Sequence, residues 1–222
     1  MKSKGLFITF EGPEGAGKTT QIKHLAVLLK KYGIPFLITR EPGGSRLSTH
    51  LRRWILNKLE YSLTNETELF LFLADRSQHV QEVVKPALDK GLVVLCDRYT
   101  DSTLAYQGGG RGFDMELLET MNRLASGGLR PDITLLLDLP VEKGLKRVMA
   151  RNKHKDRMER EGLDFHRRVR EVFLNIARKE KKRVLVLDAS QSEEVVYEQM
   201  LENLIHRLPA PQAVPAMKKK NV

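Results

Sequence analysis

The sequence predicts an α/β fold of three layers, in which a five-stranded parallel sheet is flanked by helices and carries a small lid segment. Short apolar runs recur along the chain and helical patterns separate them, which is typical of a parallel sheet covered on both faces. The 222 residues, 41% of them hydrophobic, suffice for one well-packed core. The expected strands are Leu6–Phe10, Pro35–Thr39, Leu92–Cys96, Ile133–Leu137 and Val184–Leu187.

A glycine-rich segment follows the first expected strand and leads into an expected helix, Gln21–Lys31. It matches the P-loop pattern, whose backbone N–H groups and helix N-terminus face phosphate oxygens. Lys18 can reach the β- and γ-phosphates, and the Thr19 hydroxyl can bind Mg²⁺. A glycine-rich turn without a ligand is the alternative. We therefore expect a P-loop NTPase fold that binds ATP through Gly12, Pro13, Glu14, Gly15, Ala16, Gly17, Lys18, Thr19 and Thr20.

The same periodicity predicts the remaining helices. Apolar residues at helical spacing predict a core-facing stripe around residue 165. Residues 1–208 are expected to form one domain with a lid at about 148–160, and the proline- and lysine-rich segment 209–222 a disordered basic tail. The other expected helices are Arg46–Asn57, Thr67–Lys90 (with a cap at Thr64-Asn65-Glu66 and an end at Gly91) and Glu193–Arg207.

The charge distribution bears on the class of partner. The chain carries a net charge of +10, and residues 151–183 hold 13 Lys/Arg against 6 Asp/Glu. This segment suits a basic flap over a polyanionic small substrate, or a nucleic-acid stripe, but no aromatic residues interleave it as stacking on bases requires. No apolar run approaches the roughly 20 residues of a membrane span. A single cysteine, Cys96, predicts no internal disulfide and a cytoplasmic location.

An aspartate ends the third expected strand. Asp97 then lies at the carboxyl edge of the sheet beside the P-loop, where it can hold Mg²⁺ together with Thr19. Asp138, after the fourth strand, is a rival for this role. We favour Asp97 because Arg98 next to it supplies a cation that can bridge donor and acceptor phosphates; a salt-bridged Asp-Arg pair is the alternative. The scattered histidines show no metal-ligand spacing, and the Asn-Lys-x-Asp loop of guanine-specific switches is absent.

Four motifs occur together in a recognisable order. They are Arg40-Glu41-Pro42-Gly43-Gly44, Ala74-Asp75-Arg76, Asp97-Arg98-Tyr99 and Ala105-Tyr106-Gln107-Gly108-Gly109-Gly110-Arg111. With these motifs the chain resembles thymidylate kinases of the bacterial type over residues 5–207, which implies transfer of the γ-phosphoryl group of ATP to dTMP, giving dTDP. The family forms homodimers by helix packing, and the apolar helix Thr67–Leu88 could serve here.

The resemblance implies an acceptor site for dTMP. Phe72 and Arg76, four residues apart on one expected helix, share a face. The family role is stacking of the ring on thymine and donation of the guanidinium to the O4 carbonyl; core packing is the alternative for Phe72. The triglycine Gly108–Gly110 either lets its loop approach the ligand or hinges it. The resemblance further implies acceptor contacts from Glu41 and Pro42 after the second strand (or a simple turn), from Thr103, and from Tyr106 and Gln107 in the loop after Asp97-Arg98-Tyr99.

Glu14 and the lid complete the expected site. Glu14 can accept a hydrogen bond from the 3′-hydroxyl of the acceptor deoxyribose, or face solvent without a role. Family members that lack a P-loop arginine place catalytic arginines in the lid, and here Arg147, Arg151 and Arg157 are the candidates. We expect Arg151, then Arg157, to reach the γ-phosphate; a solvated helix face is the alternative. The expected catalytic residues are Lys18, Asp97, Arg98, Arg151 and Arg157.

The predicted function is therefore phosphorylation of dTMP by ATP with Mg²⁺, in dTTP biosynthesis, by a cytoplasmic homodimer that binds small molecules and neither nucleic acid nor membrane. A kinase for another deoxynucleotide is one alternative. A P-loop nucleotide switch or a nucleic-acid-dependent ATPase is another, supported by the basic segment 151–183. A relative that binds nucleotides without turnover is disfavoured by the intact Lys18, Thr19, Asp97 and Arg98.

Overall fold

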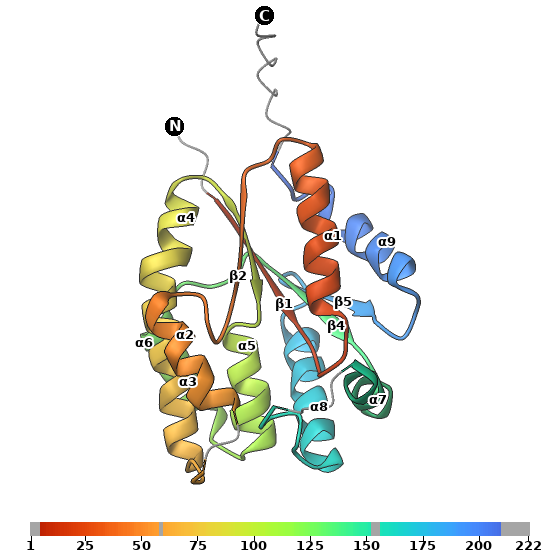
Figure 1. Ribbon diagram of the computed structural model, residues 1–222. Coiled ribbons are helices and arrows are strands. Elements are labelled where there is room, and N and C mark those ends of the chain that lie inside the picture. The colour runs from red at the N-terminus through yellow and green to blue at the C-terminus, as the bar shows by residue number, and fades with distance from the viewer. Residues whose placement is uncertain (1–4, 58–59, 152–155, 210–222) are drawn as a thin grey trace, which may run out of the picture.

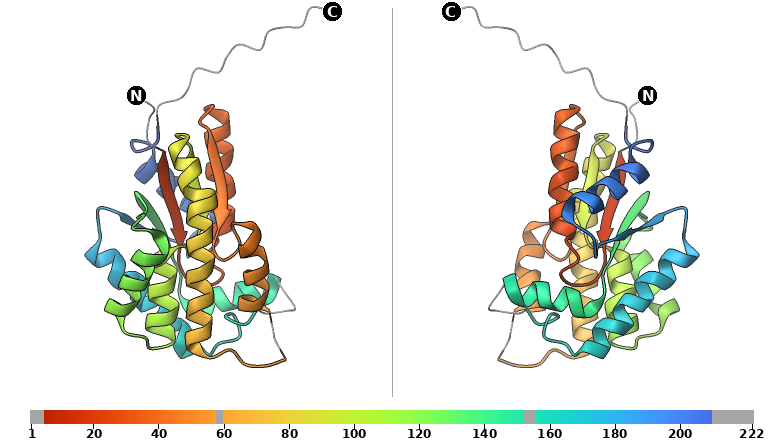
Figure 2. Two further views of the ribbon diagram at one scale, coloured as in Figure 1. Left: turned by 90° about the vertical axis from the view of Figure 1, so that its left-hand side faces the viewer. Right: turned by 90° about the vertical axis from the view of Figure 1, so that its right-hand side faces the viewer.

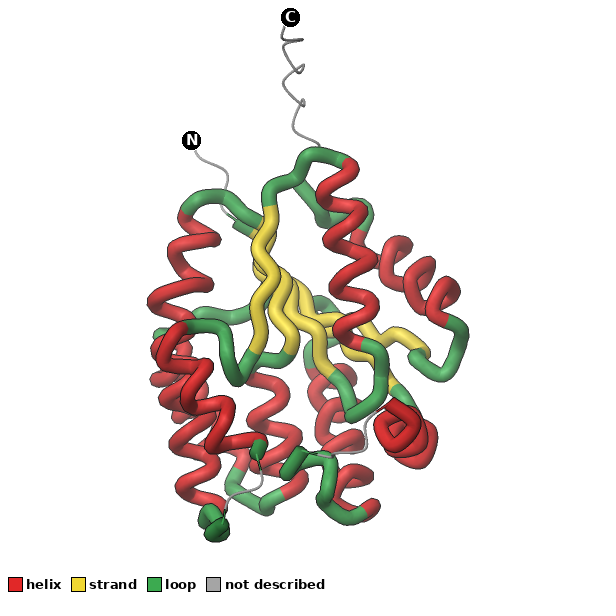
Figure 3. The backbone as a smooth tube through the Cα atoms, viewed as in Figure 1, coloured by secondary structure: helices red, strands yellow, loops and turns green. Residues whose placement is uncertain are grey.

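The computed structural model describes residues 5–57, 60–151 and 156–209. Its centre is a five-stranded sheet in the order β2-β3-β1-β4-β5, and every neighbouring pair is parallel (Figures 1 and 3). The predicted α/β fold with a five-stranded parallel sheet is therefore confirmed. The strands are β1 (Leu6–Glu11), β2 (Phe36–Arg40), β3 (Val93–Asp97), β4 (Ile133–Asp138) and β5 (Val184–Asp188).

The helices connect successive strands and lie on both faces of the sheet. Two of them contain π-helical stretches, named η1 and η2. In chain order the elements are α1 (Lys18–Lys31), α2 (Arg46–Leu56), α3 (Asn65–His79), η1 (Val80–Val84), α4 (Lys85–Asp89), α5 (Thr100–Thr103), η2 (Leu104–Gly110), α6 (Met115–Ser126), α7 (Val141–Arg151), α8 (Leu163–Lys179) and α9 (Glu193–Leu204).

The strands are buried on both faces because each face carries its own hydrophobic core. Successive side chains of β1 point to opposite sides, so Ile8 packs with Leu25 of α1 and Met200 of α9, while Phe7 packs with Val84 of η1. The two side views of Figure 2 show these layers, with the α3–α4 helix in front from one side and α9 (blue) in front from the other. A third cluster packs side chains of α3, α6 and α8 together with Leu136 of β4 and Val184 of β5.

The register of the sheet places the functional loops at one edge. Phe10 of β1 lies opposite Asp97 of β3, and Glu11 lies opposite Leu136 of β4. The P-loop after β1 and the Asp97-Arg98-Tyr99 turn after β3 therefore leave the sheet side by side. Binding sites of open α/β sheets form at this carboxyl edge. Because β2, β3 and β1 are neighbours, the loops that follow these three strands lie together there.

The long helix expected over Thr67–Lys90 is real but irregular. It begins at Asn65, where the Thr64 side chain accepts a hydrogen bond from the Thr67 amide, and it continues through η1 into α4. Pro86 lies in the first turn of α4 and has no N–H to donate to the preceding turn. The wider π-helical turn directly before the proline accommodates the missing hydrogen bond, so the helix continues.

The segment expected to be a loop around Tyr106 and Gln107 is helical, which corrects the sequence prediction. Residues 100–110 form α5 and η2 in one continuous run. The glycines serve close packing: a Cβ on Gly109 would lie 2.9 Å from the Arg168 carbonyl oxygen of α8, and one on Gly110 would lie 2.4 Å from the Phe165 ring. Neither a mobile hinge nor a ligand approach explains the three glycines, because α8 fills the space beside Gly109 and Gly110 and α6 fills the space beside Gly108.

Candidate active site

One cavity at the carboxyl edge of the sheet collects most of the residues predicted for ATP and dTMP. The P-loop forms one wall, and α3 with the α5–η2 segment forms another. Among the predicted residues, Gly12, Pro13 and Arg157 are not part of its lining. The predicted residues that line it are Glu14, Gly15, Ala16, Gly17, Lys18, Thr19, Thr20, Glu41, Pro42, Phe72, Arg76, Asp97, Arg98, Thr103, Tyr106 and Gln107.

The P-loop has the geometry of a phosphate cradle. Gly12, Gly15 and Gly17 all adopt positive φ, which lets the backbone turn sharply between β1 and α1. Lys18 is buried and its Nζ donates to the carbonyl oxygens of Gly12 and Pro13, at 3.1 and 3.0 Å. Burial and the nearby Arg98 lower the pKa of Lys18 to about 8. The ammonium group is thus held inside the loop, where phosphate oxygens of a nucleotide would surround it.

Two oxygen ligands suitable for Mg²⁺ meet beside the loop. The Thr19 hydroxyl at the start of α1 donates to Asp97 Oδ2 at 3.0 Å. A hydroxyl and one carboxylate, with substrate phosphates completing the shell, are the hard donors this ion takes in phosphoryl-transfer sites. The rival Asp138 is engaged elsewhere, because both its carboxylate oxygens accept from Arg170, at 2.7 and 2.8 Å. The residues therefore fit the ion at Thr19 and Asp97.

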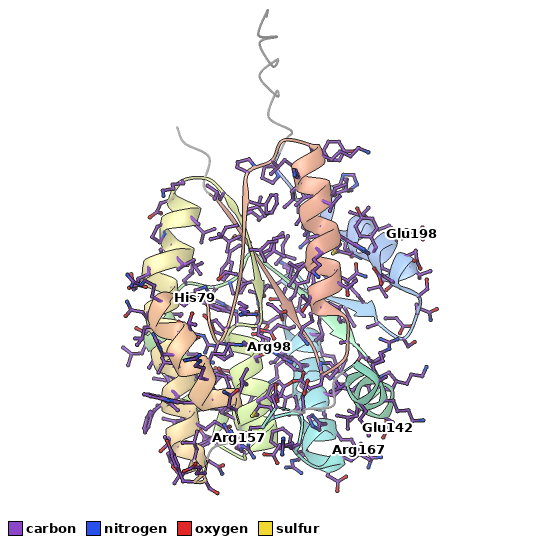
Figure 4. The ribbon with its side chains drawn as sticks, in the orientation of Figure 1. His79, Arg98, Glu142, Arg157, Arg167 and Glu198 are labelled. Carbon is purple, nitrogen blue, oxygen red and sulfur yellow. The ribbon has the colours of Figure 1, made fainter. Side chains whose placement is uncertain are left out.

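Arg98, labelled in Figure 4, lines the cavity and is held in an unusual conformation. Its φ of 72° is the only positive φ of a non-glycine residue in the described chain. Nη1 donates to the Gly12 carbonyl at 3.1 Å and to Ser102 Oγ at 3.2 Å, and the guanidinium lies 4.9 Å from the centroid of the Tyr106 ring. These contacts turn the guanidinium away from a simple pair with Asp97 and toward the P-loop.

Glu14 joins the P-loop to the opposite wall. One of its oxygens accepts from Arg98 Nη2 at 2.7 Å and from the Tyr106 hydroxyl at 2.6 Å. Burial alone would raise the pKa of Glu14, but the charges of Arg98 and Lys18 outweigh burial and lower it to about 2. The charges thus favour an ionised carboxylate, and the side chain is paired with Arg98 and Tyr106 rather than turned to solvent. A contact to a sugar hydroxyl stays a prediction.

The acceptor wall rests on a buried ion pair between Arg76 of α3 and Glu41 after β2. Arg76 is 2% exposed, and its Nε and Nη2 approach Glu41 Oε2 at 2.9 and 2.8 Å. Its Nη1 donates to Thr103 Oγ1 at 2.8 Å and to Asn122 Oδ1 at 2.5 Å. His79 completes the group by contacting the other Glu41 oxygen at 2.9 Å. Glu41, Thr103 and Asn122 thus hold the guanidinium in place, and Arg76 also lines the cavity.

Phe72 lies one turn before Arg76 and is half-buried. Both side chains line the cavity, as expected from their spacing on one helix. The ring is not a member of the hydrophobic clusters of the described chain or of the partly buried residues packed against them. A planar apolar surface beside hydrogen-bonding groups is suited to a nucleic acid base.

The expected lid falls partly outside the described residues. Arg151 ends α7, its side chain is not described, and residues 152–155 lie outside the description. Arg157 turns toward α3 and α2: its Nη1 lies 2.5 Å from Glu68 and its Nε donates to the Ile55 carbonyl at 2.9 Å (Figure 4). Arg147 donates to the Ala189 carbonyl at 3.1 Å. Contact of any lid arginine with a γ-phosphate stays a prediction.

Sequence reasoning missed Arg52, which lines the cavity, and Glu11, which supports the cavity from outside its lining. Arg52 of α2 lines the cavity and its Nη1 donates to the Pro42 carbonyl at 2.7 Å; burial and the nearby Arg40 lower its pKa. Glu11 accepts from the Tyr99 amide at 2.7 Å and the Ser102 hydroxyl at 2.6 Å, and so shapes the turn that carries Arg98. Burial and Asp101 raise the pKa of Glu11 to about 7. No local pattern marks Arg52, whereas Glu11 directly precedes the P-loop.

Within the described residues, no group of three or more His, Cys, Asp or Glu side chains could hold a metal ion by itself. The same part of the chain contains no helix long and apolar enough to cross a membrane.

Comparison with known proteins agrees with this geometry. Residues 10–200 match the family model described as thymidylate kinase. Thymidylate kinase of Desulfovibrio desulfuricans is 53% identical over 197 residues, which cover 86% of this chain and 91% of that protein. Thymidylate kinase of Carboxydothermus hydrogenoformans is 53% identical over 195 residues, covering 88% and 95%.

A solved structure extends the likeness to three dimensions. The crystal structure of thymidylate kinase from Ehrlichia chaffeensis is 34% identical and superimposes with a TM-score of 0.74, covering 90% of this chain and 99% of that one. The architecture, the P-loop cavity and the match over most of the sequence lead to one conclusion. The chain belongs to the thymidylate kinase family.

Proposed function

We propose that the cavity described above is the site of phosphoryl transfer from ATP to dTMP, with the P-loop holding the donor and the α3 wall holding the acceptor. Membership of the thymidylate kinase family implies this reaction and favours it over a nucleotide switch or a nucleic-acid-dependent ATPase. The observation that carries the assignment of the site is that the P-loop lysine and the Phe72–Arg76 face line one continuous cavity. Donor and acceptor would meet there without crossing the protein.

On the donor side, the proposed roles follow from charge. Phosphoryl transfer depends mainly on alignment and on stabilisation of charge in the transition state. Lys18 would bind the β- and γ-phosphates, and Arg98 would hold the acceptor phosphate in line. Thr19 and Asp97 would hold Mg²⁺, which supplies charge neutralisation at the transferred group when bound. A second hollow beside the P-loop, lined by Gly15, Gln21, Arg147 and Ser192, is suited to the base of ATP.

On the acceptor side, the proposed roles follow from shape and hydrogen-bond direction. Phe72 would stack on thymine, and Arg76 would donate to its O4 carbonyl from the position that Glu41 fixes. Thr103, Tyr106 and Gln107, with Pro42, would close the pocket around the nucleoside. Glu14 would accept from the 3′-hydroxyl while it pairs with Arg98. Because most charged side chains here are already paired with each other, selectivity for the acceptor base would depend on the direction of hydrogen bonds more than on charge.

Further proposals concern the lid and the assembly. Arg151 or Arg157 would approach the γ-phosphate from a lid at about 148–160, and 209–222 would be a basic tail. We propose a cytoplasmic homodimer. Exposed apolar side chains on three neighbouring helices support the dimer, namely Trp54 of α2, Phe70 of α3, and Leu117 and Leu124 of α6.

A steady-state assay with ATP and Mg²⁺ tests the proposed acceptor site. ADP release is measured with dTMP, dUMP, dCMP, dGMP and no acceptor, for the unaltered chain and for Phe72→Ala. We expect a strong preference for dTMP, and in Phe72→Ala a KM for dTMP raised about tenfold, since stacking on a base contributes about 1–3 kcal/mol. The exposed aromatic Tyr32, which does not line the cavity, provides the control variant Tyr32→Ala. Equal use of several acceptors would reject the thymine pocket, and ADP release without any acceptor would reject the kinase.

A further inference from the structure

Glu68 is the most heavily bonded carboxylate outside the residues predicted for the site. It lies on α3, one turn before Phe72, and its relative exposure is 0%. Its Oε1 accepts from Gln107 Nε2 at 3.0 Å and from Arg111 Nε at 3.1 Å. Its Oε2 accepts from Arg111 Nη2 at 3.0 Å and contacts Arg157 Nη1 at 2.5 Å. One buried side chain thus joins α3 to two segments that are distant in the sequence.

The first of these segments carries Gln107, which lines the acceptor cavity and is itself 1% exposed. An ionised carboxylate can only accept hydrogen bonds, so Glu68 fixes the amide of Gln107 with its NH₂ group toward α3. Without that partner, the amide could rotate by half a turn and exchange its donor and acceptor ends. The direction of a hydrogen bond in the acceptor cavity therefore depends on a residue outside its lining.

The second segment, residues 156–161, lies at the rim of the same cavity. Asp156, Met158 and Glu159 contribute to the cavity lining. The segment is docked on α2 through the Arg157 amide, which donates to the Leu56 carbonyl at 2.9 Å. Glu68 holds the Arg157 guanidinium from the side of α3. The rim is therefore attached to the same carboxylate that orients Gln107.

The charges at this junction favour an ionised Glu68. Burial alone would raise its pKa, but hydrogen bonds and charge from Arg111, together with the charge of Arg157, lower it. Arg111 has a second partner, since its Nη1 lies 2.7 Å from the half-buried Glu161. Charge-assisted contacts in a buried site are directional and strong, which suits a group that sets geometry.

We propose that Glu68 is a positioning residue of the kinase: it orients the Gln107 amide for the acceptor and docks the segment 156–161 at the rim of the acceptor cavity. The role of Glu68 rests on the acceptor site proposed above. It touches neither nucleotide and acts through Gln107 and Arg157.

A double-mutant cycle tests the coupling to Gln107. Glu68→Gln and Gln107→Ala are each expected to raise the KM for dTMP about tenfold, the scale of a hydrogen bond to a charged group, with the KM for ATP nearly unchanged. In the double variant the KM for dTMP should match that of Glu68→Gln alone, because loss of Gln107 adds nothing once the carboxylate that orients it is gone. Effects that multiply would overturn the proposal. Glu66→Gln, at an exposed position on the same helix, is the matched control and should leave the KM for dTMP unchanged.

The cycle also separates this inference from the proposed function. If Gln107→Ala leaves the KM for dTMP unchanged, the acceptor role of Gln107 fails. If Gln107→Ala raises it and Glu68→Gln does not, only the positioning role of Glu68 fails. Should Glu68→Gln not fold, Glu68→Asp keeps the charge for Arg111 but shortens the reach to Gln107 and Arg157, and the same outcomes are expected from it.

Hydrogen–deuterium exchange gives a readout besides activity. In the unaltered chain, the amide of Arg157 is protected by its hydrogen bond to the Leu56 carbonyl. We expect Glu68→Gln to speed exchange at this amide about tenfold, while amides of the P-loop helix α1 keep their rates. Unchanged exchange at Arg157, or equal acceleration throughout the protein, would contradict a specific docking role for Glu68.

Discussion

The two halves of the cavity are built in opposite ways. The donor half is lined by seven consecutive residues of the P-loop, 14–20, whose backbone forms the site and whose buried Lys18 holds the loop together. The acceptor half consists of side chains from the end of β2, from α3 and from the α5–η2 segment, joined by buried ion pairs such as Arg76–Glu41. Glu14 and Arg98 connect the halves, at 2.7 Å.

This difference separates two ways of binding a nucleotide. Phosphate is bound by charge and by N–H groups that any P-loop backbone offers, so a short local motif suffices. A pyrimidine has no charge to exploit, so its site needs hydrogen-bond groups in fixed directions. In the acceptor half the directions are set by partners within the protein, among them Glu41 for Arg76 and Glu68 for Gln107.

The largest effect is expected in the donor half. Lys18→Ala should lower kcat about 10³-fold, because it removes a preorganised charge at the transferred group. Steady-state kinetics with saturating ATP and dTMP measure this loss. The exposed Lys23→Ala on the same helix is the control and should keep full activity. A Lys18→Ala enzyme within tenfold of the unaltered kcat would contradict the role assigned to the P-loop.

The second prediction contrasts the stability of the two halves. Glu41→Gln leaves the buried Arg76 without its carboxylate and should lower the free energy of unfolding by about 3–5 kcal/mol. Glu14→Gln removes a pair whose side chains are 17–18% exposed, so a loss of about 1 kcal/mol is expected. Urea denaturation of both variants provides the comparison. Equal losses of unfolding free energy in the two variants would contradict the prediction that the acceptor half depends more on buried charge for its stability.

The smallest predicted effect concerns the pH dependence of stability. Burial and the neighbouring Glu41 raise the pKa of Asp75 to about 6. A group with a raised pKa stabilises the fold below its unfolded pKa, and this contribution is lost as the pH rises through 6. This loss does not occur in Asp75→Asn. The difference in free energy of unfolding between Asp75→Asn and the unaltered chain should therefore shift in favour of the variant by about 2 kcal/mol between pH 4 and pH 7.5.

Denaturation curves across this pH range measure the Asp75 effect, with the exposed Asp89→Asn as control. Glu14 in the donor half should behave in the opposite sense. Its pKa is lowered to about 2, so its contribution is present above the unfolded pKa and is lost as the pH falls. A relative stability of Asp75→Asn that stays flat or falls with rising pH would contradict the assignment.

Much of the fold and part of the site could be predicted from the sequence because the signals are local. Apolar runs and helical spacing identified the strands of the sheet, and the P-loop spacing identified the donor half. The α5–η2 helix was missed because Gly108–Gly110 is typical of a loop, and only the packing against α6 and α8 shows that the glycines permit close contact between helices. Local propensity is overridden there by tertiary contact.

The sequence by itself determined the succession of the five strands and of several helices along the chain, and the residues of the phosphate-binding loop, since these depend on backbone sterics and periodicity within about 10–20 neighbours. Only the tertiary structure decided the partners of the charged groups. Glu68 contacts Gln107 and Arg157. The side chain of Arg98, whose backbone has a positive φ, bonds to Gly12 and Glu14. Such pairings depend on which segments the sheet brings together, and a carboxylate carries no local mark of the guanidinium that it will bind.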